Sequence, residues 1–240
     1  MKLKESLLGV SVSRFTYEEL TQILLKNIEQ HHKSFIVAIN PEKIMKAQED
    51  QSLKKLLNRA DFQIPDGIGV LIASRLKGGN VRTRVTGIDL MLKLCELAHK
   101  HNKSIFLYGG KPGVAEKAKQ NLMEHLSGIK IVGVMDGYEK DENIVIEKIN
   151  AAKPDIIFVA LGSPKQEYWI VNSVDKVSAT IFQGVGGSFD VISGRVKRAP
   201  LFFQYLGLEW MYRLIKEPTR WNRQKVLPKF IYKVLREKDN

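Results

Sequence analysis

The feature that most constrains the fold is a repeated alternation of short apolar runs with longer amphipathic stretches. Four of the apolar runs are SFIVAIN (34–40), DFQIPD (61–66), SIFLYGG (104–110) and DIIFVALG (155–162). A strand that is apolar on both faces suits a parallel sheet covered by helices on both sides. Strands that alternate with helices are typical of βαβ units. We therefore predict an α/β fold with a mostly parallel sheet.

Several helix starts are visible in the sequence. Thr16-Tyr17-Glu18-Glu19 matches a capping box that opens a helix to about Gln30. Asn40-Pro41-Glu42 combines an N-cap, a proline at the first helical position and an acid in the first turn. Ser163-Pro164 predicts a further start, with Ser163 as the cap.

The C-terminal part of the chain differs in composition from the rest. The chain of 240 residues has a net charge of +12, and residues 195–240 hold 12 Lys/Arg against 4 Asp/Glu. Aromatic residues crowd there, and Pro200, Pro218 and Pro228 are expected to divide it into short helices. We predict an α/β core over residues 1–194 and a basic helical appendage over 195–240. A basic patch attracts nucleic acid, nucleotides or anionic lipid.

Two absences bear on location and on redox chemistry. The sequence has no run of 18 apolar residues, and its N-terminal apolar stretch is too short for a secretory signal, so we expect a cytoplasmic protein. The single cysteine, Cys95, lies in a helical pattern and is expected to be a buried thiol.

Small and polar residues follow the predicted strands. Ligands of open parallel sheets bind outside the carboxyl ends of the strands, which places Asn40, Asp66 and Gln166 around one cleft. Asp66 in PDGIG is either a helix N-cap or a general base that takes a proton from an attacking hydroxyl. Gly109-Gly110 is either a tight turn or a phosphate-binding turn at a helix start.

If the chain displaces a nucleoside diphosphate, side chains rather than a metal are expected to stabilise the leaving charge. The sequence has no Asp-x-Asp pair that would hold a nucleotide-bound metal, and its five histidines have no partner at metal spacing. Arg213, Arg220 and Arg223 in EWMYRLIKEPTRWNR are the candidate cations, since a guanidinium binds a diphosphate with two hydrogen bonds. The same mixture of aromatic, apolar and basic residues fits an interfacial helix on an anionic membrane or an RNA-binding arm.

Seven segments together resemble a known family. They are PDGIGV (65–70), RVTGIDL (84–90), IFLYGG (105–110), GYEKDE after VMD, FVALGSPKQE (158–167), GVGGSFDVISGRVKRAP (184–200) and EWMYRLIKEPTRWNR (209–223). In order and spacing, from about residue 7 to 230, the chain resembles the WecG/TagA/CpsF glycosyltransferases, and its last motif resembles the TagA branch most closely.

The resemblance implies a Rossmann-like core and metal-independent, cofactor-free, inverting transfer of N-acetylmannosamine. The implied donor is UDP-N-acetylmannosamine, and the implied acceptor is undecaprenyl-diphosphate-linked N-acetylglucosamine, in the wall teichoic acid linkage unit of Gram-positive bacteria. Asp66 matches the proposed base of the family. The residues implied to bind substrate are Asn40, Arg84, Gly109, Gly110, Gln166, Gly187, Arg213, Arg220 and Arg223.

Under this interpretation the appendage docks on the inner face of the cell membrane, a homo-oligomer is plausible, and no nucleic-acid partner is expected. Many relatives carry Thr-x-Asn where this chain has Ala38-Ile39-Asn40, which removes one possible hydrogen bond in the cleft. The alternatives are a relative that uses another UDP-sugar, such as UDP-N-acetylmannosaminuronic acid, and a nucleic-acid-binding module. A nicotinamide-dependent oxidoreductase is disfavoured because GxGxxG is absent.

Overall fold

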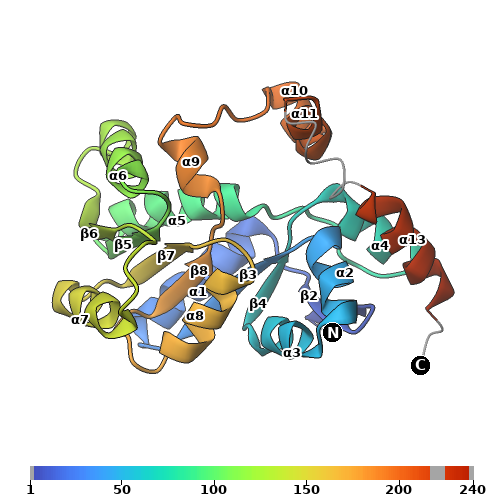
Figure 1. Ribbon diagram of the computed structural model, residues 1–240, viewed down its shortest axis with the longest axis horizontal. Helices are drawn as coiled ribbons and strands as arrows, with labels where there is room; N and C mark the ends of the chain where they lie inside the picture. Colours follow the sequence, from blue (N-terminus) through green and yellow to red (C-terminus); the bar gives the residue numbers. More distant parts are fainter. Residues whose placement is uncertain (1–2, 217–224, 238–240) are drawn as a thin grey trace.

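The centre of the molecule is a parallel sheet of six strands in the order β4-β3-β8-β7-β5-β6 (Figure 1). The computed structural model describes residues 3–216 and 225–237. The strands are β3 (Ser34–Ile39), β4 (Phe62–Pro65), β5 (Ser104–Gly109), β6 (Lys130–Met135), β7 (Ile156–Ala160) and β8 (Ile181–Gly184). All five pairings between them are parallel, which confirms the predicted α/β class.

Helices cover both faces of this sheet and form two separate apolar clusters. One face is covered by α2 (Pro41–Glu49), α3 (Gln51–Arg59), α4 (Ile68–Leu76), α7 (Glu142–Ala152), α8 (Lys165–Ser173) and α13 (Val226–Arg236). The other face is covered by α1 (Tyr17–Glu29), α5 (Gly87–Lys100), α6 (Val114–His125) and α9 (Ser188–Ile192). Two further short helices, α10 (Leu201–Tyr205) and α11 (Glu209–Lys216), follow α9.

The strands explain why both faces must be covered. In β7, Ile157 and Val159 belong to one apolar cluster, whereas Ile156, Phe158 and Ala160 belong to the other. Successive side chains of a strand point to opposite faces, so an unbroken apolar run exposes hydrocarbon to water unless helices pack on both sides. Most side chains of the sheet are therefore apolar, and the polar side chains that line a cavity lie mainly beyond the strand ends.

Helix caps fix where two helices start on the carboxyl side of the sheet. Thr16 caps α1 through the predicted capping box. The Oδ1 atom of Asn40 accepts a hydrogen bond of 2.9 Å from the backbone N–H of Lys43, which confirms the predicted N-cap of α2. The prediction for Ser163 is wrong by one residue, because α8 begins at Lys165 and Pro164 takes the N-cap position.

An N-terminal hairpin, which was not predicted from the sequence, lies beside the main sheet. Strands β1 (Lys4–Leu7) and β2 (Val10–Ser13) pair antiparallel as a separate two-stranded sheet. The hydroxyl of Ser13 accepts a hydrogen bond of 3.0 Å from the backbone N–H of Gln63 in β4. The hairpin thus covers the edge of the sheet next to β4, and unpaired edge groups are otherwise a site of aggregation.

The last helix packs into the core although it lies in the basic C-terminal part of the chain. Phe230 and Val234 of α13 are fully buried in the cluster that contains α2 and α4, and α13 lies beside these two helices (Figure 1). The sequence had suggested that Pro228 ends a helix, but this prediction is wrong, because α13 continues through it. It lies in the first turn of α13, where backbone N–H groups have no partner within the helix. Pro218 lies outside the described residues.

No helix of the described residues is both long and apolar enough to cross a bilayer.

The thiol of Cys95 is buried, as predicted, and burial raises its pKa to about 12.

The burial of α13 generates a stability prediction. Phe230→Ala should lower the free energy of unfolding by about 3–5 kcal/mol, the usual cost of deleting a buried aromatic ring. Leu235→Ala on the same helix should change it by less than about 1 kcal/mol, because this side chain is exposed. Urea denaturation of both variants measures the difference, and equal effects would mean that α13 does not contribute to the core.

Candidate active site

A cavity of about 550 Å³ lies at the carboxyl ends of β3, β4, β7 and β8. Its walls come from the turns that follow these strands, as expected for an open parallel sheet. The appendage closes part of it, through Gly207, the residues Glu209 and Trp210 of α11, and the residues Val226 and Leu227 of α13. The core and the appendage therefore share one cavity.

Asp66 follows β4 and lines this cavity. It does not cap α4, whose N-cap residue is Gly67 without a side-chain hydrogen bond. Its carboxylate instead accepts a hydrogen bond from the backbone N–H of Gly87, at the start of α5. Burial raises the pKa of Asp66 above the usual value of 3.8, whereas the positive charge of Arg84 and the Gly87 hydrogen bond oppose this rise. A carboxylate with a raised pKa is a better proton acceptor at neutral pH.

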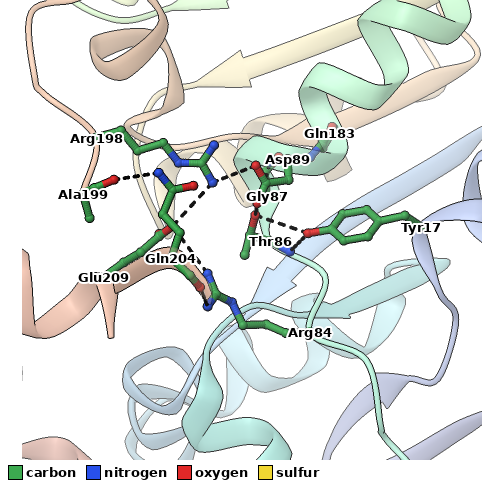
Figure 2. A network of polar contacts seen from close by, with 10 residues as sticks. All are labelled: Tyr17, Arg84, Thr86, Gly87, Asp89, Gln183, Arg198, Ala199, Gln204 and Glu209. Atoms are coloured by element: carbon green, nitrogen blue, oxygen red, sulfur yellow. Dashed lines mark hydrogen bonds and ion pairs between the residues drawn. The ribbon is translucent and has the colours of Figure 1, made fainter. Parts of the chain in front are cut away.

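The N-terminus of α5, which presents Gly87 to Asp66, is fixed by a set of hydrogen bonds (Figure 2). The Thr86 hydroxyl caps the helix by accepting from the Asp89 N–H at 3.2 Å. The Tyr17 hydroxyl accepts from the Thr86 N–H at 2.8 Å, and the Gln183 amide donates to the Gly87 carbonyl at 2.8 Å. These contacts come from α1, α5 and β8, so three elements position the donor that Asp66 faces.

Arg84 connects the cavity to the appendage. Its guanidinium donates to the Gln204 carbonyl at 3.0 Å and lies 3.5 Å from the Glu209 carboxylate. The same Glu209 oxygen lies 3.4 Å from Arg198, which also pairs with Asp89 of α5 at 2.7 Å. Figure 2 shows these groups converging from the core and from α10 and α11. Two arginines and two carboxylates thus join the appendage to the residues beside Asp66.

A second polar cluster contains Lys43, Gln166 and Glu167. The Lys43 ammonium lies 2.8 Å from the Glu167 carboxylate, and both side chains are buried. The Gln166 amide donates to the same carboxylate oxygen at 3.1 Å, and its oxygen accepts from the Gly186 N–H at 3.0 Å. The cluster therefore ties α2, α8 and the turn after β8 together.

The structure brings together five of the residues expected at the site. Asn40, Asp66, Arg84, Gln166 and Gly187 all line the cavity.

Gly109 and Gly110 are not among the described residues that line it. A Cβ atom at Gly109, where φ is +116°, would lie 2.5 Å from the Ala160 carbonyl oxygen, so glycine is required there by packing. Arg213 lies on α11, but its side chain, like Arg220 and Arg223, lies outside the described residues. The substrate-binding roles of these five residues stay predictions, as do those of the residues that line the cavity.

Four charged residues at or next to the cavity were not predicted from the sequence: Lys43, Glu167, Arg198 and Glu209. For Lys43 a signal was present. It precedes the buried Ala47 by four positions, which places it on the core-facing side of α2, where an unpaired lysine is rarely buried. Glu167 follows Gln166 directly in the sequence. Only the folded structure shows that the side chain of Glu167 meets that of Lys43.

The chain is similar to known proteins over most of its length. The model of the "Glycosyl transferase WecG/TagA/CpsF family" matches residues 5–240. A Bacillus spizizenii protein is 42% identical over 209 residues, which cover 87% of this chain and 81% of the relative. A Bacillus subtilis protein is 41% identical over 213 residues, covering 89% and 83%, and a Staphylococcus aureus protein is 33% identical over 237 residues, covering 98% and 93%.

All three relatives are named N-acetylglucosaminyldiphosphoundecaprenol N-acetyl-beta-D-mannosaminyltransferase. The similarity extends over nearly the whole chain and includes the strands, turns and helices that form the cavity. The chain therefore belongs to the WecG/TagA/CpsF family of glycosyl transferases.

Proposed function

We propose that this enzyme transfers N-acetylmannosamine from UDP-N-acetylmannosamine to undecaprenyl-diphosphate-linked N-acetylglucosamine, in synthesis of the wall teichoic acid linkage unit. The names of the relatives support the transferred sugar and the acceptor. The observation that favours the chemistry is Asp66, a carboxylate with a raised pKa that lines a cavity shared by core and appendage.

The reaction we propose is a single displacement with inversion. An acceptor hydroxyl attacks the anomeric carbon, the bond from that carbon to the phosphate oxygen of UDP breaks, and the electron pair leaves with UDP. Asp66 receives the hydroxyl proton as the new glycosidic bond forms. The backbone N–H of Gly87 and the charge of Arg84 keep the carboxylate ionised and oriented before the reaction.

Side-chain cations would offset the negative charge of the departing diphosphate, so we propose a metal-independent reaction. Lys43 and Arg84 both line the cavity. Fixed cations in a partly closed cavity stabilise developing charge without rearranging during the reaction. Arg213, Arg220 and Arg223 are proposed to add to this charge.

The appendage is also proposed to dock on an anionic membrane, where the lipid-linked acceptor resides. Among its residues, Leu201, Phe202 and Tyr205 of α10 and Ile215 of α11 are exposed. A cluster of exposed apolar side chains in a strongly basic segment fits the membrane interface. The same apolar surface could instead bind a second copy of the chain.

Asp66→Asn should lower the turnover number at least about a hundredfold, because general base catalysis contributes roughly 10²–10⁴ in rate. The folded state should be as stable as before or more stable at pH 8, since a raised carboxyl pKa means that ionised Asp66 opposes folding there. A UDP-release assay with a panel of UDP-sugars measures rate and donor choice, and thermal unfolding measures stability. Glu124→Gln, an exposed substitution on α6, is the matched control, and full activity of Asp66→Asn would refute the assignment.

The pH dependence tests the same residue independently. Turnover should fall with decreasing pH as Asp66 becomes protonated, at a pH above the usual aspartate range near 3.8. Arg84 lowers the pKa of Asp66, so Arg84→Met should move this acid limb to higher pH. Arg82→Met, at an exposed arginine two positions earlier, should leave the limb in place. An unshifted limb in Arg84→Met would contradict the proposed interaction.

Membrane docking has its own test. Leu201→Ser/Phe202→Ser should weaken binding to phosphatidylglycerol-containing vesicles at least about tenfold, because burying each apolar side chain contributes about 1.5–3 kcal/mol. Co-sedimentation measures the binding, with Met123→Ser on α6 as an exposed apolar control. Unchanged binding together with a smaller oligomer in analytical ultracentrifugation would assign the surface to self-association instead.

A further inference from the structure

Lys43 and Glu167 form a buried ion pair that the sequence did not reveal. The nitrogen-to-oxygen distance is 2.8 Å, and the side chains are 8% and 0% exposed. Removing two charges from water is costly, and a buried ion pair often stabilises a protein no better than apolar residues of the same volume. A contribution to folding stability therefore does not by itself explain why this ion pair is present.

Only one member of the pair borders the cavity. Lys43 lines the cavity, whereas Glu167 is fully buried and is not among the described lining residues. An ammonium group can donate three hydrogen bonds, and the structure describes one from the Lys43 ammonium, to Glu167. Two of these donors therefore have no partner among the described residues, and a fully buried carboxylate holds the ammonium in place.

Neighbouring groups fix both members of the pair. Asn40, at the cavity, caps the first turn of α2 through the backbone N–H of Lys43. Gln166 donates to the same oxygen of Glu167 that contacts Lys43. The other oxygen of Glu167 is buried with no hydrogen-bond partner among the described residues, so loss of Lys43 would leave this carboxylate poorly compensated. Both the position and the charge of Lys43 are thereby constrained.

We propose that Lys43 binds the diphosphate of a substrate in this cavity, and that Glu167 is a positioning residue that holds the Lys43 ammonium toward it. The inference rests on the proposed function, which supplies a diphosphate on both the donor nucleotide and the lipid acceptor. The phosphate oxygens would accept the hydrogen bonds that the Lys43 ammonium can still donate. Because Glu167 already holds the ammonium, little rearrangement of the side chain is needed when the diphosphate binds.

The first experiment is equilibrium binding measured by isothermal titration calorimetry. Lys43→Met should raise the dissociation constant for UDP roughly tenfold to a hundredfold, the range for a hydrogen bond between charged groups, and should leave that for uridine unchanged. Lys55→Met, at an exposed lysine of α3, should bind UDP as the original chain does. A parallel titration uses a short-chain polyprenyl-diphosphate-linked N-acetylglucosamine. If Lys43→Met loses affinity for this acceptor but not for UDP, the ligand of Lys43 is the acceptor diphosphate. Unchanged affinity for both diphosphates would overturn the proposal.

A second variant protects the experiment against a folding defect. Lys43→Met/Glu167→Gln removes both charges and so avoids the buried unpaired carboxylate that could unfold the single variant. It should fold and show the same loss of affinity for diphosphate as Lys43→Met. Recovery of the original affinity in this double variant would show that the single variant failed for structural reasons and would also overturn the proposal.

The role of Glu167 is tested by a double-mutant cycle on affinity for the diphosphate. Glu167→Gln should weaken binding less than Lys43→Met does, because the ammonium remains but is less well held. It should have no effect once residue 43 is Met, because Glu167 acts through Lys43. Equal effects of Glu167→Gln in both backgrounds would exclude positioning.

Failure of this inference differs from failure of the proposed function. If Lys43→Met binds UDP normally and still transfers the sugar, only the proposed role of Lys43 is refuted. A chain that neither binds UDP nor releases it from any UDP-sugar removes the proposed function itself.

Discussion

The complete covering of a parallel sheet is the constraint on which the site depends. Helices pack on both faces, so most side chains of the strands are apolar, and the polar residues Asn40 and Asp66 of the cavity lie beyond the strand ends. Asn40 and Asp66 follow β3 and β4, Gly162 follows β7, and Gly186 and Gly187 follow β8. The cavity is thus a consequence of the way the sheet is buried, and its chemistry depends on which residues occupy the four turns.

The ionisation of Asp66 results from two opposing effects that come from different parts of the chain. Burial favours the neutral carboxyl group, and Arg84 favours the carboxylate. Arg84 is itself held by the Gln204 carbonyl and by Glu209, which belong to the appendage. The position of α10 and α11 therefore bears on the proton affinity of a residue in the core, and α13 anchors the same appendage through Phe230.

Local patterns were sufficient to predict the strands of the sheet, the α/β class and two N-caps. Each of these depends on periodicity or on residues three positions apart, as with Asn40 and Lys43. The convergence of Asn40, Asp66 and Gln166 was predictable as well, because parallel strands end at one edge. The ion pair of Lys43 with Glu167 was not, since 124 positions separate the partners and its existence depends on how α2 and α8 pack. The burial of α13 was hidden for a similar reason, because its basic composition resembles that of an exposed segment.

If a diphosphate binds in the cavity and Asp66 acts as the base, as we propose, the pairing of the cations resolves a conflict between these two roles. A diphosphate requires positive charge nearby, but every unpaired cation would also lower the pKa of Asp66 and weaken it as a base. Lys43 is paired with Glu167 and Arg84 with Glu209, and the charge of Glu209 acts on Asp66 in the direction opposite to those of Lys43 and Arg84. At long range, the negative charge of each carboxylate cancels much of the electric field of its cation. At short range, the cation still has N–H groups that can donate hydrogen bonds to a ligand. Paired cations can therefore bind an anion at contact distance while they perturb a carboxylate several ångströms away much less than free cations would.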